Sequence, residues 1–183
     1  MATIGLKNLV YSKLTKDDEI GAAYSEVKKI APAINARISP KTEISNLYAD
    51  DGAVETVTSL GEIEVELEIS DLPIDIQADL QGHTVNAGVI IKKSTDTAPY
   101  VAIGFKSEKA NGSYRYKWLY KGKFSLFEEE FKTKEDKVEF QTPKLKATFV
   151  KRLFDDAWEA TADEDAVDFN PLTATNWFTS VFE

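Results

Sequence analysis

The stretch GEIEVELEIS, residues 61–70, alternates apolar and acidic residues with the two-residue period of a β-strand. Because strand side chains alternate between faces, one face should line a core and the other should carry four carboxylates. The predicted core positions are Ile63, Val65, Leu67 and Ile69. The acidic column consists of Glu62, Glu64, Glu66 and Glu68.

Such a column needs water or cations in front of it. Same-face neighbours on a strand are roughly 7 Å apart, and at an effective dielectric constant of 20 each pair repels by about 2.4 kcal/mol. Four interpretations are open: a solvated outer face, a metal site, a patch for a basic partner, or the wall of an aqueous channel.

Further strand-like segments predict a mainly β chain with two packed sheets in a sandwich or barrel-like arrangement. The Asn111–Gly112 pair between two of them predicts a hairpin. The segments are Leu6–Leu14, Ala33–Ile38, Thr84–Lys92, Tyr100–Ser107, Tyr114–Tyr120, Lys137–Gln141 and Lys144–Lys151.

One flanking helix is predicted over residues 72–81, with Asp71 as N-cap and Gly82 as left-handed C-cap. A second short helix is expected to begin near Asn170–Pro171. Residues 38–61 predict a long loop or an extended hairpin. Residues 153–183, acidic and without clear periodicity at first, are interpreted as a C-terminal arm.

The composition predicts one globular domain over residues 1–183. The chain is 43% hydrophobic and contains no cysteine, so neither a disulfide framework nor a thiolate nucleophile is available. No run approaches the roughly 18 apolar residues of a membrane helix, and the N-terminus lacks the pattern of a secretory signal. We therefore expect a soluble protein made in a cytoplasm, with no membrane partner.

The charges are unevenly distributed along the chain. Residues 106–152 carry 13 basic and seven acidic side chains, whereas residues 153–183 carry eight acidic side chains and no basic one. The acidic segment either neutralises the basic segment of its own chain or docks on that of a neighbouring copy, as in a head-to-tail ring.

Catalytic groups are scarce, and we predict no enzyme, no catalytic or metal-binding residues and no cofactor. The single histidine, His83, follows the predicted helix end, where a structural role is expected. The acids Asp50, Asp51 and Glu55 lack the spacing of a calcium loop. The spacing of the glutamate column fits a glycosidase pair, but nothing distinguishes an acid from a base among equivalent exposed carboxylates.

Residues 114–121 mix aromatic and basic side chains, as do sheets that bind single-stranded nucleic acid. Tyr114, Tyr116, Trp118 and Tyr120 share one strand face, which we expect to be core. Two alternative functions are kept on this basis, a single-strand nucleic-acid binder and a carbohydrate-binding or adhesin-like sandwich with an exposed aromatic platform.

Four long stretches resemble the major tail proteins, or tail tube proteins, of long non-contractile-tailed bacteriophages (siphoviruses) and prophages of Gram-positive bacteria. They are IGLKNLVYSKL (4–14), NLYADDGAVETVTSLGEIEVELEISDLPIDIQADLQGHTV (46–85), APYVAIGFKSEKANGSYRYKWLYKGKF (98–124) and EEFKTKEDKVEFQTPKLKATFVKR (129–152). The resemblance implies a tail tube fold, hexameric rings stacked into a tube, and genomic DNA that passes through without specific binding. It also implies a virion location and, as partners, other tail proteins: tape measure, terminator, baseplate and chaperones.

In such a tube the acidic column has three possible places: the lumen, where it would repel DNA, the outer surface, or a contact with the basic segment of another subunit. Contacts between subunits or rings are expected in the 38–61 segment and the C-terminal arm. The candidate contact residues are Leu47, Tyr48, Asp50, Asp51, Val54, Trp177, Phe178 and Phe182.

Overall fold

A computed structural model describes residues 2–49, 52–129, 133 and 142–182. For residues 47–49 and 52–55 it describes the backbone alone. None of its helices is long and apolar enough to cross a membrane, as far as the described residues show. The strands are β1 (Thr3–Asp18), β2 (Gly21–Tyr24), β3 (Lys28–Lys29), β4 (Ala33–Ala49), β5 (Gly52–Ile69), β6 (Thr84–Asn86), β7 (Val89–Ile91), β8 (Val101–Lys109), β9 (Tyr114–Phe124), β10 (Lys144–Phe149) and β11 (Glu159–Asp163). The helices are α1 (Ile74–Gln81) and α2 (Pro171–Asn176).

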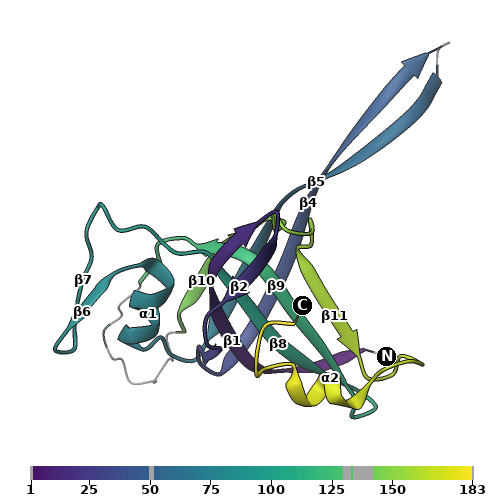
Figure 1. Cartoon of the computed structure of the whole chain (residues 1–183). Coiled ribbons are helices and arrows are strands. Elements are labelled where there is room, and N and C mark those ends of the chain that lie inside the picture. The colour runs from purple at the N-terminus through teal and green to yellow at the C-terminus, as the bar shows by residue number, and fades with distance from the viewer. Residues whose placement is uncertain (1, 50–51, 130–132, 134–141, 183) are drawn as a thin grey trace.

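Nine strands form one antiparallel sheet with the order β2-β1-β8-β9-β10-β5-β4. β3 pairs with β1. β11 pairs with β9, next to the residues of β9 that pair with β10. The sheet curls until β4 comes close to β1, as Figure 1 shows. The mainly β class is confirmed. The predicted pair of packed sheets is not what the described strands form: beside the one large sheet, the second sheet contains only β6 and β7.

Two cores lie on opposite faces of β8 and β9. Ile103 and Leu119 point into the larger core, which the curled sheet encloses together with α1. Ala102 and Trp118 point to the other face, into a smaller core covered by the C-terminal segment. Alternation along each strand thus supplies both cores. The aromatic face predicted to be buried is confirmed for Tyr116, Trp118 and Tyr120.

Close packing on both faces of the curled sheet depends on two glycines. A Cβ atom at Gly122 would lie 2.5 Å from the Phe149 ring, and one at Gly104 would lie 2.8 Å from the Trp118 ring. Contacts that short do not occur between real side chains, so both large rings lie flat against backbone.

The 38–61 segment is an extended hairpin rather than a loop. β4 and β5 continue as a paired ribbon from Ala33–Ile69 in the sheet to Ala49–Gly52 at its outer end. Figure 1 shows this ribbon projecting from the body of the molecule. We call its outer part, residues 41–60, the projecting hairpin.

The flanking helix α1 is confirmed, although it begins later than predicted. Its N-cap is Pro73 rather than Asp71, whose carboxylate accepts a hydrogen bond from the adjacent Leu72 N–H and does not cap the helix. Gly82 has the expected left-handed conformation, with φ of 74°. The second helix begins where predicted, and the Asn170 side chain accepts from the Leu172 N–H at 3.0 Å.

Two further predictions differ from the structure. Residues 84–92 form the hairpin β6–β7 rather than one strand, because Ala87 and Gly88 both have positive φ, as a two-residue type I′ turn requires. The segment 153–169, interpreted as part of an arm, contains β11, which pairs with β9 over Leu119–Arg115. The predicted strand Lys137–Gln141 lies outside the described residues.

Candidate functional site

The acidic column on β5 is the first candidate surface. Ile63, Val65, Leu67 and Ile69 are fully buried, and the intervening glutamates point outward, as predicted. Glu62, Glu64 and Glu66 are exposed and Glu68 is half-buried. The column therefore lies on the outer face of the curled sheet, opposite its main core.

Cations from both neighbouring strands flank the column. Glu66 lies opposite Lys146 on β10 and Arg37 on β4, and Glu68 lies opposite Lys144. Directly opposite side chains have Cβ atoms about 5 Å apart, closer than the roughly 7 Å between successive glutamates. The cations that the column requires thus come from its own sheet.

Two direct contacts add to this compensation. Lys41 Nζ lies 2.5 Å from Glu64 Oε1, and the hydrogen bond raises the pKa of Lys41. Thr142 donates its hydroxyl to Glu68 Oε1 at 2.5 Å. The outer face is therefore a set of alternating acidic and basic stripes rather than a purely acidic wall.

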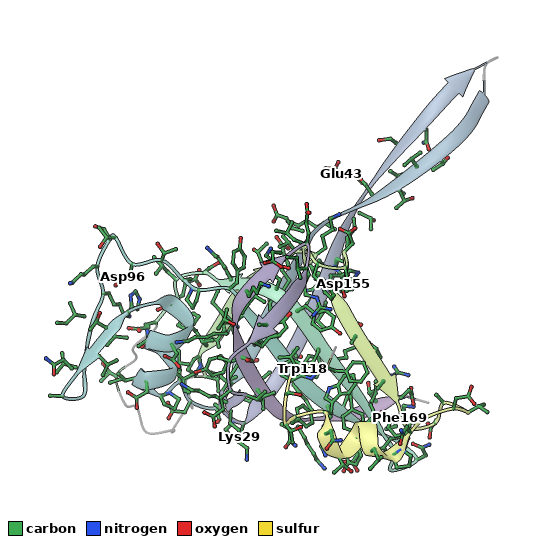
Figure 2. All side chains as sticks on the ribbon, in the orientation of Figure 1. Lys29, Glu43, Asp96, Trp118, Asp155 and Phe169 are labelled. Carbon is green, nitrogen blue, oxygen red and sulfur yellow. The ribbon has the colours of Figure 1, made fainter. Side chains whose placement is uncertain are left out.

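The projecting hairpin is the second candidate surface. Ile44 is 64% exposed and Val57 59% exposed, and they lie on opposite faces of the ribbon because Ile44 pairs with Thr58 and Val57 with Ser45. Within the described chain each strand of the ribbon pairs only with the other, so its outer edges carry unpaired backbone groups. Exposed apolar side chains and free strand edges are typical of surfaces that another chain covers. Figure 2 shows Glu43 on this ribbon, away from the body.

The predicted contact residues in this region are placed only by their backbone. Leu47 pairs with Glu55 and Tyr48 with Ala53 near the end of the ribbon, and Val54 lies between these pairs on β5. Asp50 and Asp51 lie outside the described residues.

A groove of about 620 Å³ opens at the base of the hairpin. Its lining combines apolar side chains of β1, β4 and β8 with the charged ends of Arg115, Lys117 and Glu159. Ile34 and Pro40 on β4 form one wall, and Trp158, just before β11, lies on another. The groove lies where the curled sheet is not closed by hydrogen bonds between β4 and β1.

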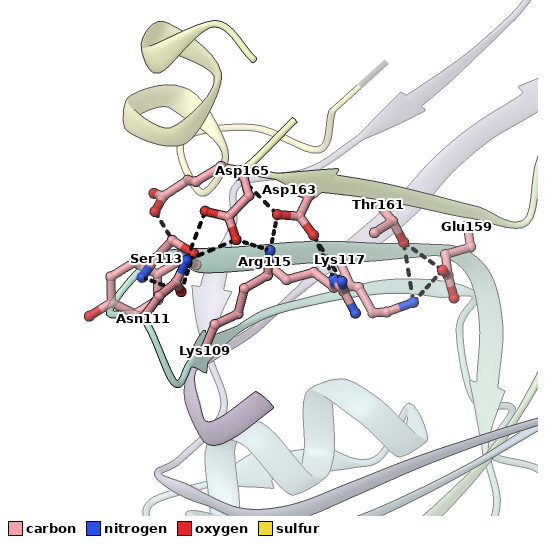
Figure 3. Close-up of polar contacts among 11 residues, drawn as sticks. Lys109, Asn111, Ser113, Arg115, Lys117, Glu159, Thr161, Asp163 and Asp165 are labelled. Atoms are coloured by element: carbon pink, nitrogen blue, oxygen red, sulfur yellow. Dashed lines mark hydrogen bonds and ion pairs between the residues drawn. The ribbon is translucent and has the colours of Figure 1, made fainter. Parts of the chain in front are cut away.

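The acidic tail binds the basic segment of its own chain. Lys109, only 2% exposed, forms ion pairs with Asp163 and, at 2.8 Å, with Asp165. Arg115 pairs with Asp163 at 2.8 Å and Lys117 with Glu159 (Figure 3). The hydrogen bond from Lys109, followed by that from Arg115, lowers the pKa of Asp163 well below its usual range. Of the two arrangements open from sequence, the described ion pairs fit intramolecular neutralisation.

The three C-terminal aromatic candidates have different environments. Trp177 is 2% exposed, and its carbonyl accepts from Trp118 Nε1 at 2.9 Å, so its side chain is unavailable to another subunit and the expectation for it is corrected. Phe178 is half-buried, 6.1 Å from the Tyr116 ring centroid. Phe182 is 43% exposed and stacks on Trp177 with centroids 4.9 Å apart, so it alone of the three presents a large surface.

The alternative functions lose most of the aromatic face on which they were based, of which Tyr114 alone is half-buried rather than buried. Tyr116 and Trp118 are buried beneath the C-terminal segment and therefore form no exposed platform for sugars or bases (Figure 2 labels Trp118). Arg115 and Lys117 on the other face are engaged by carboxylates of the tail. The described residues also hold no group of three or more histidine, aspartate or glutamate side chains arranged for a metal ion.

Sequence reasoning missed the anchor around Asp79, because its partners lie far away in the chain. The carboxylate accepts from Tyr11, Lys13 and Lys28, each at 2.8 Å, and so ties α1 to β1 and β3. Partial burial favours the neutral acid, but the hydrogen bonds from Lys13, Lys28 and Tyr11 outweigh it and lower the pKa of Asp79 to about 2. No single stretch of sequence signals this cluster.

Neither a scan against protein-family models nor a search of curated proteins found a match for this chain.

Proposed function

We propose that this chain is a major tail protein, a structural virion subunit that assembles as hexameric rings stacked into the tail tube of a long-tailed bacteriophage. The tube would conduct DNA during ejection, and the proposal assigns no catalysis to the chain. It combines the sequence resemblance with one structural observation, the projecting hairpin, whose apolar side chains and strand edges a single copy leaves uncovered.

The hairpin supports assembly because a long exposed ribbon is costly to an isolated molecule. Exposed edges invite uncontrolled pairing, and natural proteins usually shorten, charge or cover them. In a ring or a stack of rings, the ribbon of one copy would be covered by another copy. The groove at its base, with apolar walls and charged ends, is a candidate receiving surface.

The striped outer face is the surface that the proposal assigns to the lumen. A tube that conducts DNA should not hold phosphates tightly. The glutamates of β5 would repel the DNA backbone, and because they lie opposite Lys144, Lys146 and Arg37 they would offset the attraction of these cations for phosphate.

Charge reversal on β5 tests this lumen assignment. We expect a phage carrying Glu64→Lys with Glu66→Lys to form tails of normal length but to eject DNA more slowly than wild type. The matched control is Glu19→Lys with Glu26→Lys, which changes the same net charge at exposed positions away from β5. Equal ejection rates for the two double variants would place the column outside the lumen.

The remaining partners follow from the proposed role. They are the tape measure, terminator and baseplate proteins and the chaperones of tail assembly, and the site of action is the virion tail after synthesis in the host cytoplasm. Negative-stain electron microscopy and sedimentation of the purified protein test the role: rings or tubes with a hole wide enough for duplex DNA support it. A monomer at every concentration, even with tail initiator proteins added, would refute it.

A further inference from the structure

We infer that the imidazolium form of His83 is a pH-dependent clasp that holds the segment after β7 against the end of α1 and the end of β9. This inference is independent of the proposed function. It rests on the hydrogen-bond partners of the two ring nitrogens.

Both nitrogens of His83 face acceptors. Nδ1 lies 2.8 Å from Asp96 Oδ2, and Nε2 lies 3.0 Å from Gln81 Oε1. The side chain is only 3% exposed, so water has little access to replace either contact. A neutral imidazole has one donor and one acceptor nitrogen, whereas the cation has two donors.

The orientation of Gln81 is set by a third group. Its Nε2 donates to the Ser125 carbonyl at 3.2 Å, and the side chain is buried. Turning the amide over to offer a donor to His83 would place Oε1 against that carbonyl oxygen. The chain Asp96–His83–Gln81–Ser125 is therefore satisfied throughout only when the ring carries both protons.

Each neutral tautomer breaks one link. A proton on Nε2 alone leaves a lone pair of Nδ1 against the Asp96 carboxylate. A proton on Nδ1 alone leaves Nε2 against the Gln81 oxygen, or turns the amide and breaks the contact with Ser125. Buried acceptors that face each other lose the favourable bond and keep the desolvation penalty.

The links join three separate segments. Asp96 follows β7 and also accepts the Lys93 N–H at 2.8 Å, Gln81 ends α1, and Ser125 follows β9. The segment around Thr97 lies directly on the helix end, because a Cβ atom at Gly82 would lie 2.3 Å from the Thr97 carbonyl oxygen. Asp96 is labelled at this end of the molecule in Figure 2.

The other charged groups that the structure describes near the ring are already engaged or lie outside the clasp. Asp79 on α1, which lines a pocket with His83, accepts from Lys13 and from Lys28 on β3. Lys92, which follows β7, forms an ion pair at 3.0 Å with Glu129, which follows β9. Asp75 on α1 lines the same pocket, and Lys93 contributes its backbone N–H to Asp96. Among the described residues, Asp96 is the carboxylate that hydrogen-bonds to the ring.

Loss of the proton should therefore loosen the β6–β7 hairpin while the large sheet stays intact. In the part of the chain that the structure describes, the hairpin has few other supports, since only Val85 and Ile90 of its strands are half-buried, whereas Val89 and Ile91 are exposed. Local opening is expected first in a segment with so little burial.

His83 is the only histidine in the chain, so nitrogen NMR of the histidine-labelled protein reports this ring without ambiguity. We propose to follow both ring nitrogens and amide hydrogen exchange between pH 5 and pH 9. We expect exchange protection of the β6–β7 amides to fall about tenfold in step with loss of the ring proton, while protection in β8 and β9 is unchanged. Protection that is constant while the ring titrates would overturn the inference.

Two variants that preserve shape separate a clasp from a passive contact. Asp96→Asn removes the charge facing Nδ1, and Gln81→Glu adds one facing Nε2. We expect the loss of β6–β7 protection to occur at lower pH in the first variant and at higher pH in the second, because the first removes and the second adds a negative charge beside the ring. Identical titrations in the two variants, or ring titration without a matching change in protection, would contradict it.

Discussion

The two halves of β5 have the same alternating strand structure but very different surroundings. Residues 61–69 place Ile63, Val65 and Leu67 in a closed core, whereas residues 52–60 continue into the projecting hairpin, where Val57 is exposed. Backbone pairing with β4 continues along both halves. Backbone pairing is therefore common to both halves and does not explain their different stabilisation. The inner half is stabilised by burial of its side chains within its own chain, whereas the exposed side chains of the outer half lack a surface that covers them.

The largest expected difference between the halves concerns apolar truncation. Leu67→Ala should lower the free energy of unfolding by about 3 kcal/mol, because it removes a fully buried side chain and leaves a cavity. Val57→Ala, in the outer half, should change the stability of the monomer by less than about 0.5 kcal/mol. Urea unfolding of both variants measures the difference. Equal losses would mean that the hairpin packs against its own chain.

A second effect tests the packing of the core that the inner half of β5 lines. Gly122→Ala should cost about 2 kcal/mol, because the added methyl group must displace the Phe149 ring. Gly21→Ala is the control, since no atom lies within 4 Å of the position of its Cβ. Thermal unfolding of both variants gives the comparison. If Gly122→Ala is as stable as the control, the close contact between β9 and β10 is not present in solution.

The Asp79 anchor should have a smaller, pH-dependent effect. Its pKa falls from 3.8 to about 2 in the folded chain, so the carboxylate stabilises the fold above pH 3.8 and this contribution disappears as the pH falls from there toward 2. After allowance for solvent screening, Asp79→Asn should lose about 1 kcal/mol at pH 7 and progressively less below pH 4. Urea titrations at pH 7, 5 and 3.5 measure this trend, and a loss that grows with acidity would be the wrong sign.

The smallest effect is expected at the boundary of the two halves. The ion pair between Lys41 and Glu64 is about half exposed on both sides, and exposed pairs contribute little. Glu64→Gln should therefore change stability by less than about 0.5 kcal/mol, and added salt should reduce this change further because exposed charges are screened. A loss of more than 1 kcal/mol in urea unfolding would show that the column acts as a structural network rather than as a surface.

The sequence predicts elements whose signal is local. The alternation of residues 61–70 correctly predicts both faces of inner β5, and Gly82 correctly marks the end of α1. The β6–β7 hairpin was missed because its turn places Ala87, an unusual residue for positive φ, in the first turn position.

Contacts between distant segments are harder to predict. β11 has the sequence EATAD, without bulky alternating residues, and its pairing with β9 is accompanied by ion pairs to a segment more than 40 residues earlier. The charge asymmetry signalled this partnership but left open which copy supplies the tail. Trp177 was misassigned for the same reason: burial against Trp118 depends on how the chain returns after β11.

The most direct test of the central claim compares sedimentation and electron microscopy of the wild type with those of Ile44→Asp combined with Val57→Asp. The control is Ile20→Asp, at a position 84% exposed in the turn after β1. The account predicts that wild type and control form rings or tubes, whereas the double variant remains a folded monomer with unchanged urea unfolding. Normal rings or tubes from the double variant would contradict it, because the projecting hairpin would then not be the surface that another copy covers.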